Sequence, residues 1–147
     1  MNQIVIGSDH GGVNLKNKIV EQLKEKGYDV VDKGCFSDES VDYPDYAIQV
    51  AEAVGTGEIP KGILVCGSGI GVSIVANKVK GVRAALCTDV RLAKLSRQHN
   101  NSNILCLGER ILKEKNALMM VDTWLSTEFE GDRHNRRVEK IHSLTGR

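Results

Sequence analysis

The sequence predicts an α/β protein in which helices cover both faces of a five-stranded parallel sheet. Five short apolar runs, rich in valine and isoleucine, recur along the 147 residues. Stretches with apolar residues at the three- and four-residue spacing of amphipathic helices separate these runs. Because nearly all-apolar strands that alternate with helices are typical of parallel sheets buried on both faces, we expect a doubly wound, Rossmann-like αβα sandwich. The length suits a single domain over residues 1–147.

The individual elements follow from these patterns in chain order. The runs that we expect to form strands are residues 3–7, 29–32, 62–66, 82–87 and 103–107. Helices of ten or more residues are expected after the strands. Apolar positions mark two of them, Leu15, Ile19, Val20 and Leu23 in one and Ala47, Val50, Ala51 and Val54 in the other, and a shorter helix is marked by Leu92, Leu95 and Ser96. Two further helices are predicted at about 112–125 and 135–144. The second is short and strongly charged, and we expect this extra C-terminal helix to pack against a partner subunit.

Composition and charge exclude several classes of partner. Twenty basic and nineteen acidic residues give a net charge of +1, and aromatic residues make up 4% of the chain, so we expect no nucleic-acid partner. No apolar run approaches the ~18 residues of a membrane span, and residues 1–4 do not resemble a signal peptide, so we predict a cytoplasmic protein without membrane contact. The four cysteines lack CxxC spacing and lie too far apart for a disulfide scaffold. A small enzyme or a small-ligand binder remains.

The most specific local signal is Cys66 with the glycines that follow it. Ligands of open parallel sheets bind at the carboxyl ends of the strands, where helices begin. Cys66 ends the third predicted strand, and Gly67, Gly69 and Gly71 follow without the spacing of dinucleotide or P-loop sites. These glycines would let backbone N–H groups approach a developing oxyanion, and the positive end of the next helix would stabilise a Cys66 thiolate. The alternative is a buried cysteine beside glycines that only permit close helix packing.

Two histidines are predicted at the same edge of the sheet as Cys66. His10 follows Asp9 after the first strand, and His99 lies in a polar cluster before the fifth strand. Their positions favour acid–base work, against the alternative of ordinary surface or hydrogen-bonded histidines. A zinc site with Cys66 and Asp9 is a weaker alternative, because the sequence has no short ligand spacing, and we expect no metal. The remaining cysteines, interpreted as thiols without a role, are Cys35, Cys87 and Cys106.

A basic cluster stands at the start of the last predicted helix. Arg133 and Arg137 are four residues apart, so they share one helix face and could bind a phosphate or carboxylate. His134, Arg136 and Lys140 add to the cluster. The alternative is a solvated basic face. Because the chain as a whole is nearly neutral, this local concentration of charge favours an anion site.

Five segments together resemble the ribose-5-phosphate isomerase B family, whose wider group includes allose-6-phosphate isomerase and the subunits of galactose-6-phosphate isomerase. The segments are GSDHGG (7–12), DYPDYA (42–47), CGSGIG (66–71) with ANK (76–78), SRQHN (96–100) and EGDRH (130–134). The resemblance covers nearly the whole chain and implies a cofactor-free, metal-free aldose–ketose isomerase that interconverts ribose 5-phosphate and ribulose 5-phosphate through a cis-enediolate. Allose 6-phosphate or galactose 6-phosphate remains the alternative substrate. A non-catalytic nucleotide or sugar-phosphate binding domain is the alternative of a different class.

The resemblance also implies a role for each site residue. Cys66 corresponds to the base that takes the proton from C2 of the opened sugar, and His99 corresponds to the residue that opens the furanose ring. Ser68 stands where many members have threonine, and it keeps the hydroxyl of that catalytic position. The resemblance implies that the enediolate is stabilised by the backbone of Gly67, Gly69, Ile70 and Gly71. The implied sugar contacts are Asp9, Tyr43 and Asn100. The implied phosphate contacts are His10, Arg110, Arg133 and Arg137, and the second subunit of a homodimer supplies some of them. A tetramer is the alternative assembly.

Overall fold

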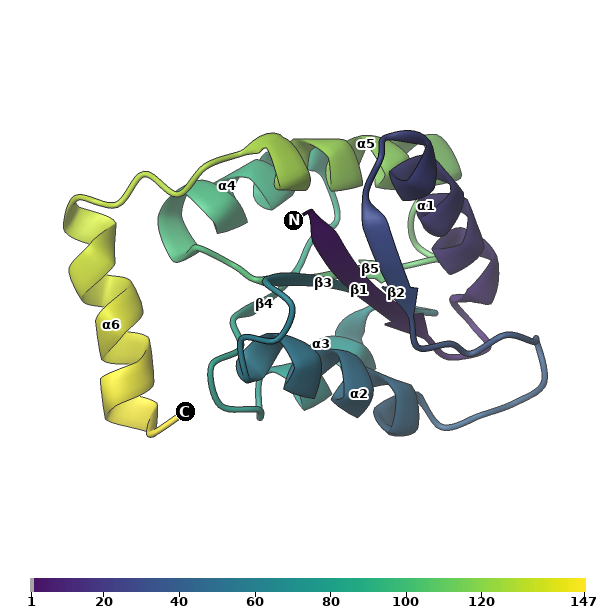
Figure 1. Ribbon diagram of the computed structural model, residues 1–147, viewed down its shortest axis with the longest axis horizontal. Helices are drawn as coiled ribbons and strands as arrows, with labels where there is room; N and C mark the ends of the chain where they lie inside the picture. The colour runs from purple at the N-terminus through teal and green to yellow at the C-terminus, as the bar shows by residue number, and fades with distance from the viewer. Residues whose placement is uncertain (1) are drawn as a thin grey trace.

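The computed structural model describes residues 2–147 and contains a parallel sheet with the strand order β2-β1-β3-β5-β4. The strands are β1 (Gln3–Ser8), β2 (Asp29–Asp32), β3 (Lys61–Cys66), β4 (Ala84–Leu86) and β5 (Ile104–Gly108). They all point the same way because a helix carries the chain back between successive strands (Figure 1). The predicted α/β fold with a five-stranded parallel sheet is confirmed.

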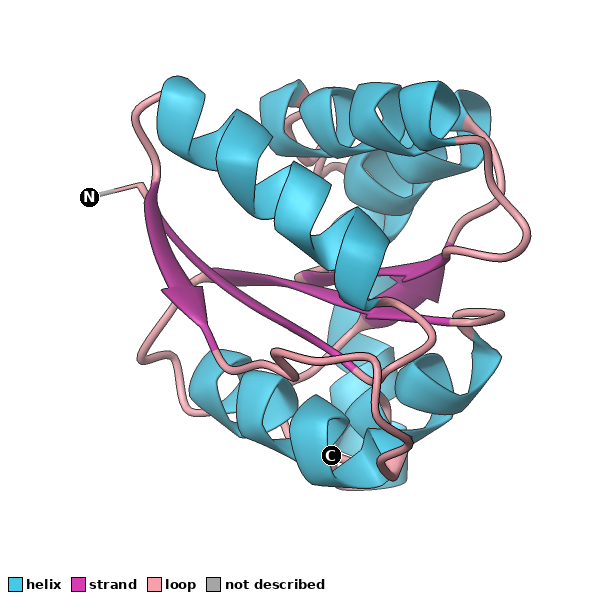
Figure 2. Ribbon diagram, turned by 90° about the vertical axis from the view of Figure 1, so that its right-hand side faces the viewer, coloured by secondary structure: helices cyan, strands magenta, loops and turns pink. Residues whose placement is uncertain are grey.

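Helices cover both faces of this sheet. On one face lie α1 (Val13–Glu25), α4 (Val90–Asn100) and α5 (Glu114–Ser126), and on the other lie α2 (Tyr43–Gly55) and α3 (Ile70–Ala76) (Figure 1, Figure 2). Side chains of each strand alternate between the two layers. In β1, Ile4 and Ile6 join the core beneath α1 and α5, whereas Val5 joins the core above α2 and α3. This double burial explains why the strands are apolar almost throughout.

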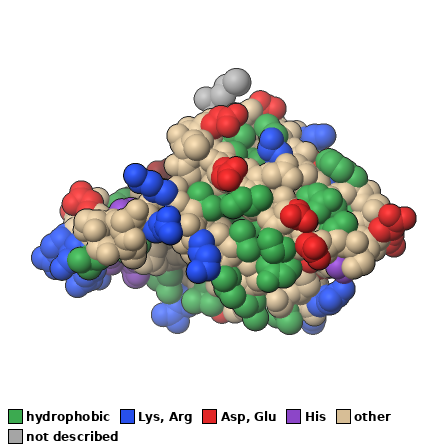
Figure 3. Space-filling model, turned by 90° about the horizontal axis from the view of Figure 1, so that it is seen from below, with side chains coloured by type: hydrophobic (Ala, Val, Ile, Leu, Met, Phe, Trp, Pro, Cys, Tyr) green, Lys and Arg blue, Asp and Glu red, His purple; other side chains and the backbone are tan. Residues whose placement is uncertain are grey.

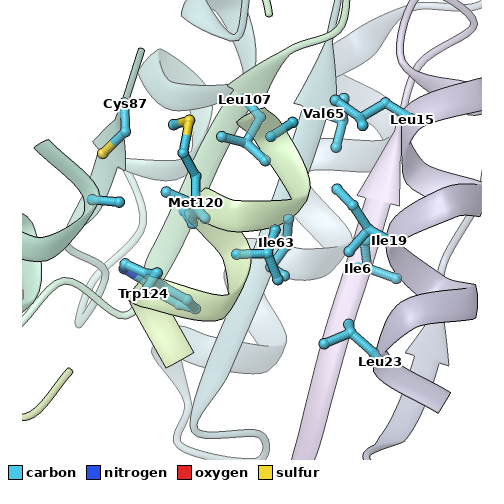
Figure 4. Packing of buried hydrophobic residues seen from close by; sticks show 14 of the residues in the cluster. Ile6, Leu15, Ile19, Leu23, Ile63, Val65, Cys87, Leu107, Met120 and Trp124 are labelled. Atoms are coloured by element: carbon cyan, nitrogen blue, oxygen red, sulfur yellow. The ribbon is translucent and has the colours of Figure 1, made fainter. Parts of the chain in front are cut away.

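The core on the α1 and α5 side consists of large aliphatic side chains around one tryptophan (Figure 4). Ile19 of α1 and Met120 of α5 are fully buried against the sheet. Trp124 is also fully buried, and its indole Nε1 donates a hydrogen bond of 2.8 Å to the hydroxyl of Ser102. The indole N–H of Trp124 therefore has a hydrogen-bond partner, so burial of the ring leaves no donor unpaired.

Two elements are shorter than the sequence pattern indicates. β4 covers residues 84–86 and not 82–87, because the Arg83 N–H donates to the side chain of Asn103 at 2.7 Å and leaves the strand ladder. α3 has seven residues, fewer than the ten or more expected. It ends where the Asn77 side chain bonds both the N–H and the C=O of Ala84, a contact that turns the chain into β4.

The last helix, α6 (Arg133–Thr145), stands outside the sandwich, beside β4 and the end of α4 (Figure 1). Its apolar residues are largely exposed, and Leu144 retains 78% of its accessible surface. A groove of about 380 Å³ separates α6 from the body, with Asn100 on one wall and Ile141 on the other. The extra C-terminal helix is confirmed, while its packing against a partner stays a prediction. Within residues 2–147, none of the helices has the length and apolarity needed to cross a membrane.

Candidate active site

A crevice opens at the carboxyl ends of β1 and β3, where the strand order reverses. The chain leaves β1 towards α1 on one face and leaves β3 towards α3 on the other, so the two connections diverge. A cavity of about 350 Å³ lies there, and its lining also includes Ile111, which no motif marks although it directly follows Arg110. The predicted site residues that line this cavity are Asp9, Tyr43, Cys66, Gly67, Ser68, Gly71 and Arg110.

The sulfur of Cys66 is held by the backbone of the loop that follows it. The Gly69 N–H donates to Cys66 Sγ at 3.1 Å, which fixes the position of the sulfur relative to this loop. Gly69 has φ +80°, and a Cβ atom there would lie 2.6 Å from Leu86 Cδ1. Only glycine fits this left-handed, crowded position, so the residue type at 69 fixes the direction of the N–H group.

Ser68 and Tyr43 complete the wall of the cavity on the α3 side. The Ile70 N–H donates to the Ser68 hydroxyl oxygen at 3.1 Å, so the hydroxyl proton remains available for a ligand. That contact also engages the Ile70 amide, which was expected to face the enediolate. The Tyr43 ring, at the first residue of α2, lies against the backbone of Gly71 at the start of α3.

Arg110 brings a positive charge to the mouth of the cavity. The loop after β5 is fastened to the Cys66 loop by two backbone hydrogen bonds, from Glu109 N–H to the Cys66 carbonyl (2.9 Å) and from Arg110 N–H to the Gly67 carbonyl (3.0 Å). The guanidinium lies so close over Gly67 that a Cβ atom there would be 3.0 Å from Nη1. An anionic ligand in the cavity would therefore meet this guanidinium.

Asp9 and His10 follow β1 at the opposite wall. Asp9 is nearly buried, and its Oδ1 accepts a hydrogen bond of 2.9 Å from the Gly11 N–H. His10 Nδ1 accepts from the Val41 N–H at 3.1 Å, so a neutral imidazole carries its proton on Nε2 and can donate it. His10 lies next to Asp9 but does not line the cavity.

The remaining predicted residues are not at this edge, and the expectation of one common edge for Cys66 and His99 is wrong within a single chain. His99 and Asn100 are the last two residues of α4. A helix that follows a parallel strand runs back, so its end lies near the start of the next strand, not near the carboxyl ends. Arg133 and Arg137 lie on α6, beyond the same end of α4. One chain thus carries the predicted site residues in two groups at separate places.

His99 instead lies in a cluster with Glu130 and His134. The two imidazole rings are stacked with their centroids 4.4 Å apart, and Glu130 Oε1 lies 3.7 Å from Nε2 of each. Burial, with the neighbouring His99 and Arg133, holds the pKa of His134 below its usual value. Within residues 2–147, these three side chains form a group whose ligand atoms lie close enough together to hold a metal ion.

Comparison with known proteins gives consistent likenesses over the whole chain. A family model described as "Ribose/Galactose Isomerase" matches residues 4–141. Ribose-5-phosphate isomerase B of Escherichia coli K12 is 50% identical over 147 residues, which are 100% of this chain and 99% of that protein. The solved structure of ribose-5-phosphate isomerase B from Clostridium thermocellum is 55% identical with a TM-score of 0.96, covering 98% of this chain and 97% of that one. The Mycoplasma genitalium ribose-5-phosphate isomerase B, solved with bound ribulose-5-phosphate, is 46% identical with a TM-score of 0.94, covering 98% and 96%.

Proposed function

Because the chain belongs to the ribose/galactose isomerase family, we propose that it interconverts ribose 5-phosphate and ribulose 5-phosphate. The observation that carries this proposal is Cys66, whose sulfur accepts a backbone N–H and opens on a cavity beside Arg110. A thiolate next to a fixed cation is suited to take a proton from a phosphorylated sugar. The choice of a pentose phosphate is supported by the substrate in the name of the Escherichia coli relative and by the ketose bound to the Mycoplasma genitalium protein.

In the proposed reaction, a single base moves a proton between neighbouring carbons. The Cys66 thiolate takes the proton from C2 of the open-chain aldose, and the electron pair of that C–H bond forms the enediolate. The hydroxyl proton on O2 passes to O1, so that the negative charge moves to O2. Cys66 then returns the carbon-bound proton to C1 as the C2=O bond forms, which gives the ketose. The thiol and thiolate forms alternate, and no electron leaves the substrate, so the step balances without a redox partner.

Negative charge on the enediolate would be stabilised by N–H groups of the loop after Cys66. The amides of Gly69 and Ile70 are engaged by Cys66 and Ser68, so we assign this role first to Gly71. Gly71 is the second residue of α3, where an N–H group has no partner within the helix. The free hydroxyl proton of Ser68 would donate to a neighbouring sugar oxygen.

We infer that a second copy of the chain completes the site. His99, which would open the furanose ring, and Asn100 lie at the end of α4, away from the cavity that holds Cys66. Phosphate would be bound by Arg110 and the Nε2–H of His10 from one chain, and by Arg133 and Arg137 of the other. A two-fold homodimer forms two such shared sites, and a tetramer would be a pair of these dimers.

We also place the enzyme in the cytoplasm. All four cysteines are free thiols, which suits a reducing compartment. A reducing compartment would also protect a catalytic thiolate from oxidation.

The proposal is tested by following ketose formation from ribose 5-phosphate, with allose 6-phosphate and galactose 6-phosphate as parallel substrates. Cys66→Ala should abolish turnover, whereas the same change at the buried Cys87 should leave turnover within a few-fold of the wild type. Retained turnover in Cys66→Ala would exclude Cys66 as the base. Binding of the sugar phosphates to the wild type without any turnover would favour the non-catalytic alternative, and faster turnover of a six-carbon sugar would reassign the substrate.

A further inference from the structure

The cluster at the junction of α4 and α6 contains two imidazoles and a carboxylate that lie together at the surface of the single chain. Their ligand atoms all lie within 4.8 Å of one another. We propose that His99, Glu130 and His134 bind a divalent transition-metal ion of the zinc class, and that this ion inhibits the enzyme. The second half of the proposal rests on the proposed function.

The distances between the ligand atoms are close to those of a bound site. Tetrahedral zinc, with bonds of about 2.0–2.1 Å, separates its ligand atoms by about 3.3 Å. Glu130 Oε1 already lies 3.7 Å from Nε2 of both His99 and His134. An imidazole nitrogen binds a metal ion in the plane of its ring, so His99 must turn out of its stacked arrangement with His134 before both rings can bind one ion. The side chains of His99 and Glu130 are exposed enough to turn towards the buried His134.

The backbone that carries these ligands is fixed by hydrogen bonds. The Glu130 N–H donates to the Gln98 carbonyl at 3.1 Å, which fastens the loop before α6 to the last turn of α4. The His134 N–H donates to the Gly131 carbonyl at 2.9 Å, and the His134 ring is largely buried against His99. Three ligands from two helices and a loop are thus held together before any ion arrives, which lowers the entropy cost of binding.

The donor set selects the kind of ion. Two imidazole nitrogens and one carboxylate oxygen suit zinc, cobalt, nickel or copper, whereas magnesium and calcium prefer oxygen ligands alone. His99 and Glu130 are 38% and 46% exposed, so water can occupy a fourth position. Arg133 and Arg137 lie near His134 and oppose a cation, as the basic colour around the projecting α6 shows (Figure 3). We therefore expect a weaker affinity than that of a closed structural zinc site.

Metal binding would remove His99 from the reaction. The nitrogen that donates or accepts the proton during ring opening would be coordinated, so the cyclic substrate could not be opened by this residue. Inhibition should be reversed by a chelator, because His99 and Glu130 are exposed in the single chain and, in the proposed dimer, His99 faces the cavity that the substrate enters.

The binding test uses Co²⁺ as a spectroscopic probe of the whole protein, with no substrate present. We expect one Co²⁺ per chain with visible absorption of low-symmetry coordination and without the near-ultraviolet band of thiolate ligation. His134→Ala should weaken binding by more than ~10-fold, and Glu130→Gln, a change at an exposed side chain, should also weaken it. The matched control His142→Ala, on the same helix, and Cys66→Ala should bind like the wild type. Loss of binding in Cys66→Ala, unchanged binding in Glu130→Gln, or no Co²⁺ signal at all would overturn the proposal.

The inhibition test compares turnover of ribose 5-phosphate with and without added Zn²⁺. Zinc should inhibit the wild type and His142→Ala, and a chelator should restore the rate. Glu130→Gln should need at least ~10-fold more zinc for the same inhibition. An enzyme without turnover even in chelator contradicts the proposed function and leaves the Co²⁺ result standing. An active enzyme with a Co²⁺ spectrum but no zinc inhibition contradicts the inhibitory role.

Discussion

Cys66 differs from the other three cysteines in what surrounds its sulfur. Cys106 is fully buried, and burial together with the neighbouring Cys66 and Cys87 raises the pKa of its thiol. Burial also raises the pKa of Cys87 to about 11, and the Cys35 thiol donates to the Ser37 carbonyl at 3.3 Å. Cys66 instead accepts an N–H and lines an open cavity. Cys66 therefore combines a backbone N–H donor to its sulfur with a place in the lining of the cavity.

Iodoacetamide near neutral pH should modify Cys66 first, because alkylation needs both a thiolate and an open approach. Cys87, with its pKa of about 11, stays protonated under these conditions and should react only on unfolding. Peptide mass spectrometry over time measures the order, and ribose 5-phosphate in the mixture should slow the first modification. Labelling of Cys35 or Cys87 before Cys66 would contradict this assignment.

A methyl group at position 69 tests the backbone donor to the Cys66 sulfur. Gly69→Ala must both adopt a left-handed φ and displace Leu86, so the N–H group moves and turnover should fall by ~100-fold or more, as on loss of one oxyanion-hole donor. The matched control is Gly57→Ala, since Gly57 has φ +81° with open space around it and lies away from the cavity. Both variants should lose stability, by about 1–2 kcal/mol for the backbone strain alone, but only the first should lose activity. Equal activities in the two would remove the loop from the mechanism.

At the scale of elements, a buried ion pair fastens α1 to the last residue of β2. Lys16 is fully buried, and its Nζ donates to Asp32 Oδ2 at 2.6 Å. The other carboxylate oxygen of Asp32 accepts from the Gly34 N–H at 2.9 Å, and the Gly34 carbonyl accepts from the Ser8 N–H at 2.6 Å. This chain of contacts reaches the residue before Asp9, so the ion pair supports one wall of the site.

Asp32→Asn should destabilise the fold by about 3 kcal/mol, because it leaves the Lys16 ammonium buried without its counter-charge. The lower end of the range for buried pairs applies because Asp32 is 23% exposed. Asp122→Asn breaks the ion pair with Lys26, which is exposed on both sides, and should cost less than about 1 kcal/mol. Urea denaturation of both variants measures the difference, and similar midpoints would show that the Lys16 ammonium finds another partner.

The elements show which parts of the structure local sequence patterns can predict. β1, β3 and β5 are buried on both faces, so their apolar runs predict them and their carboxyl-end residues, which include Asp9 and Cys66. The three-residue β4 and seven-residue α3 are shaped by Asn77 and Asn103 side chains that bond to distant backbone, and no periodicity encodes such contacts. To predict where His99 lies, one must know at which end of the sheet α4 ends. Its contact with Glu130 depends on where the chain returns after α5.

At the scale of the whole molecule, one chain holds the proposed site residues in two separate groups. The cavity at the carboxyl ends holds Cys66 and Arg110, while the α4 and α6 junction holds His99 with Arg133 and Arg137 nearby. α6 also leaves apolar side chains exposed, and one of them, Ile141, lines the groove between α6 and the body. A two-fold pair of chains can bring the first group of each copy to the second group of the other. Sedimentation should therefore show at least a dimer.

Mixed dimers test whether the two groups work together across chains. We expect Cys66→Ala and His99→Ala homodimers each to be inactive, since every site carries a lesion. A heterodimer of the two, isolated with two different tags after co-expression, has one site with both lesions and one intact site, so it should regain about half of the wild-type activity per dimer. The control heterodimer pairs Cys66→Ala with Arg110→Ala, two residues of the same cavity, and should stay inactive because each site keeps one lesion. A first heterodimer as inactive as its parents would mean that His99 serves the Cys66 of its own chain, which would require α4 to move its last turn across the sheet.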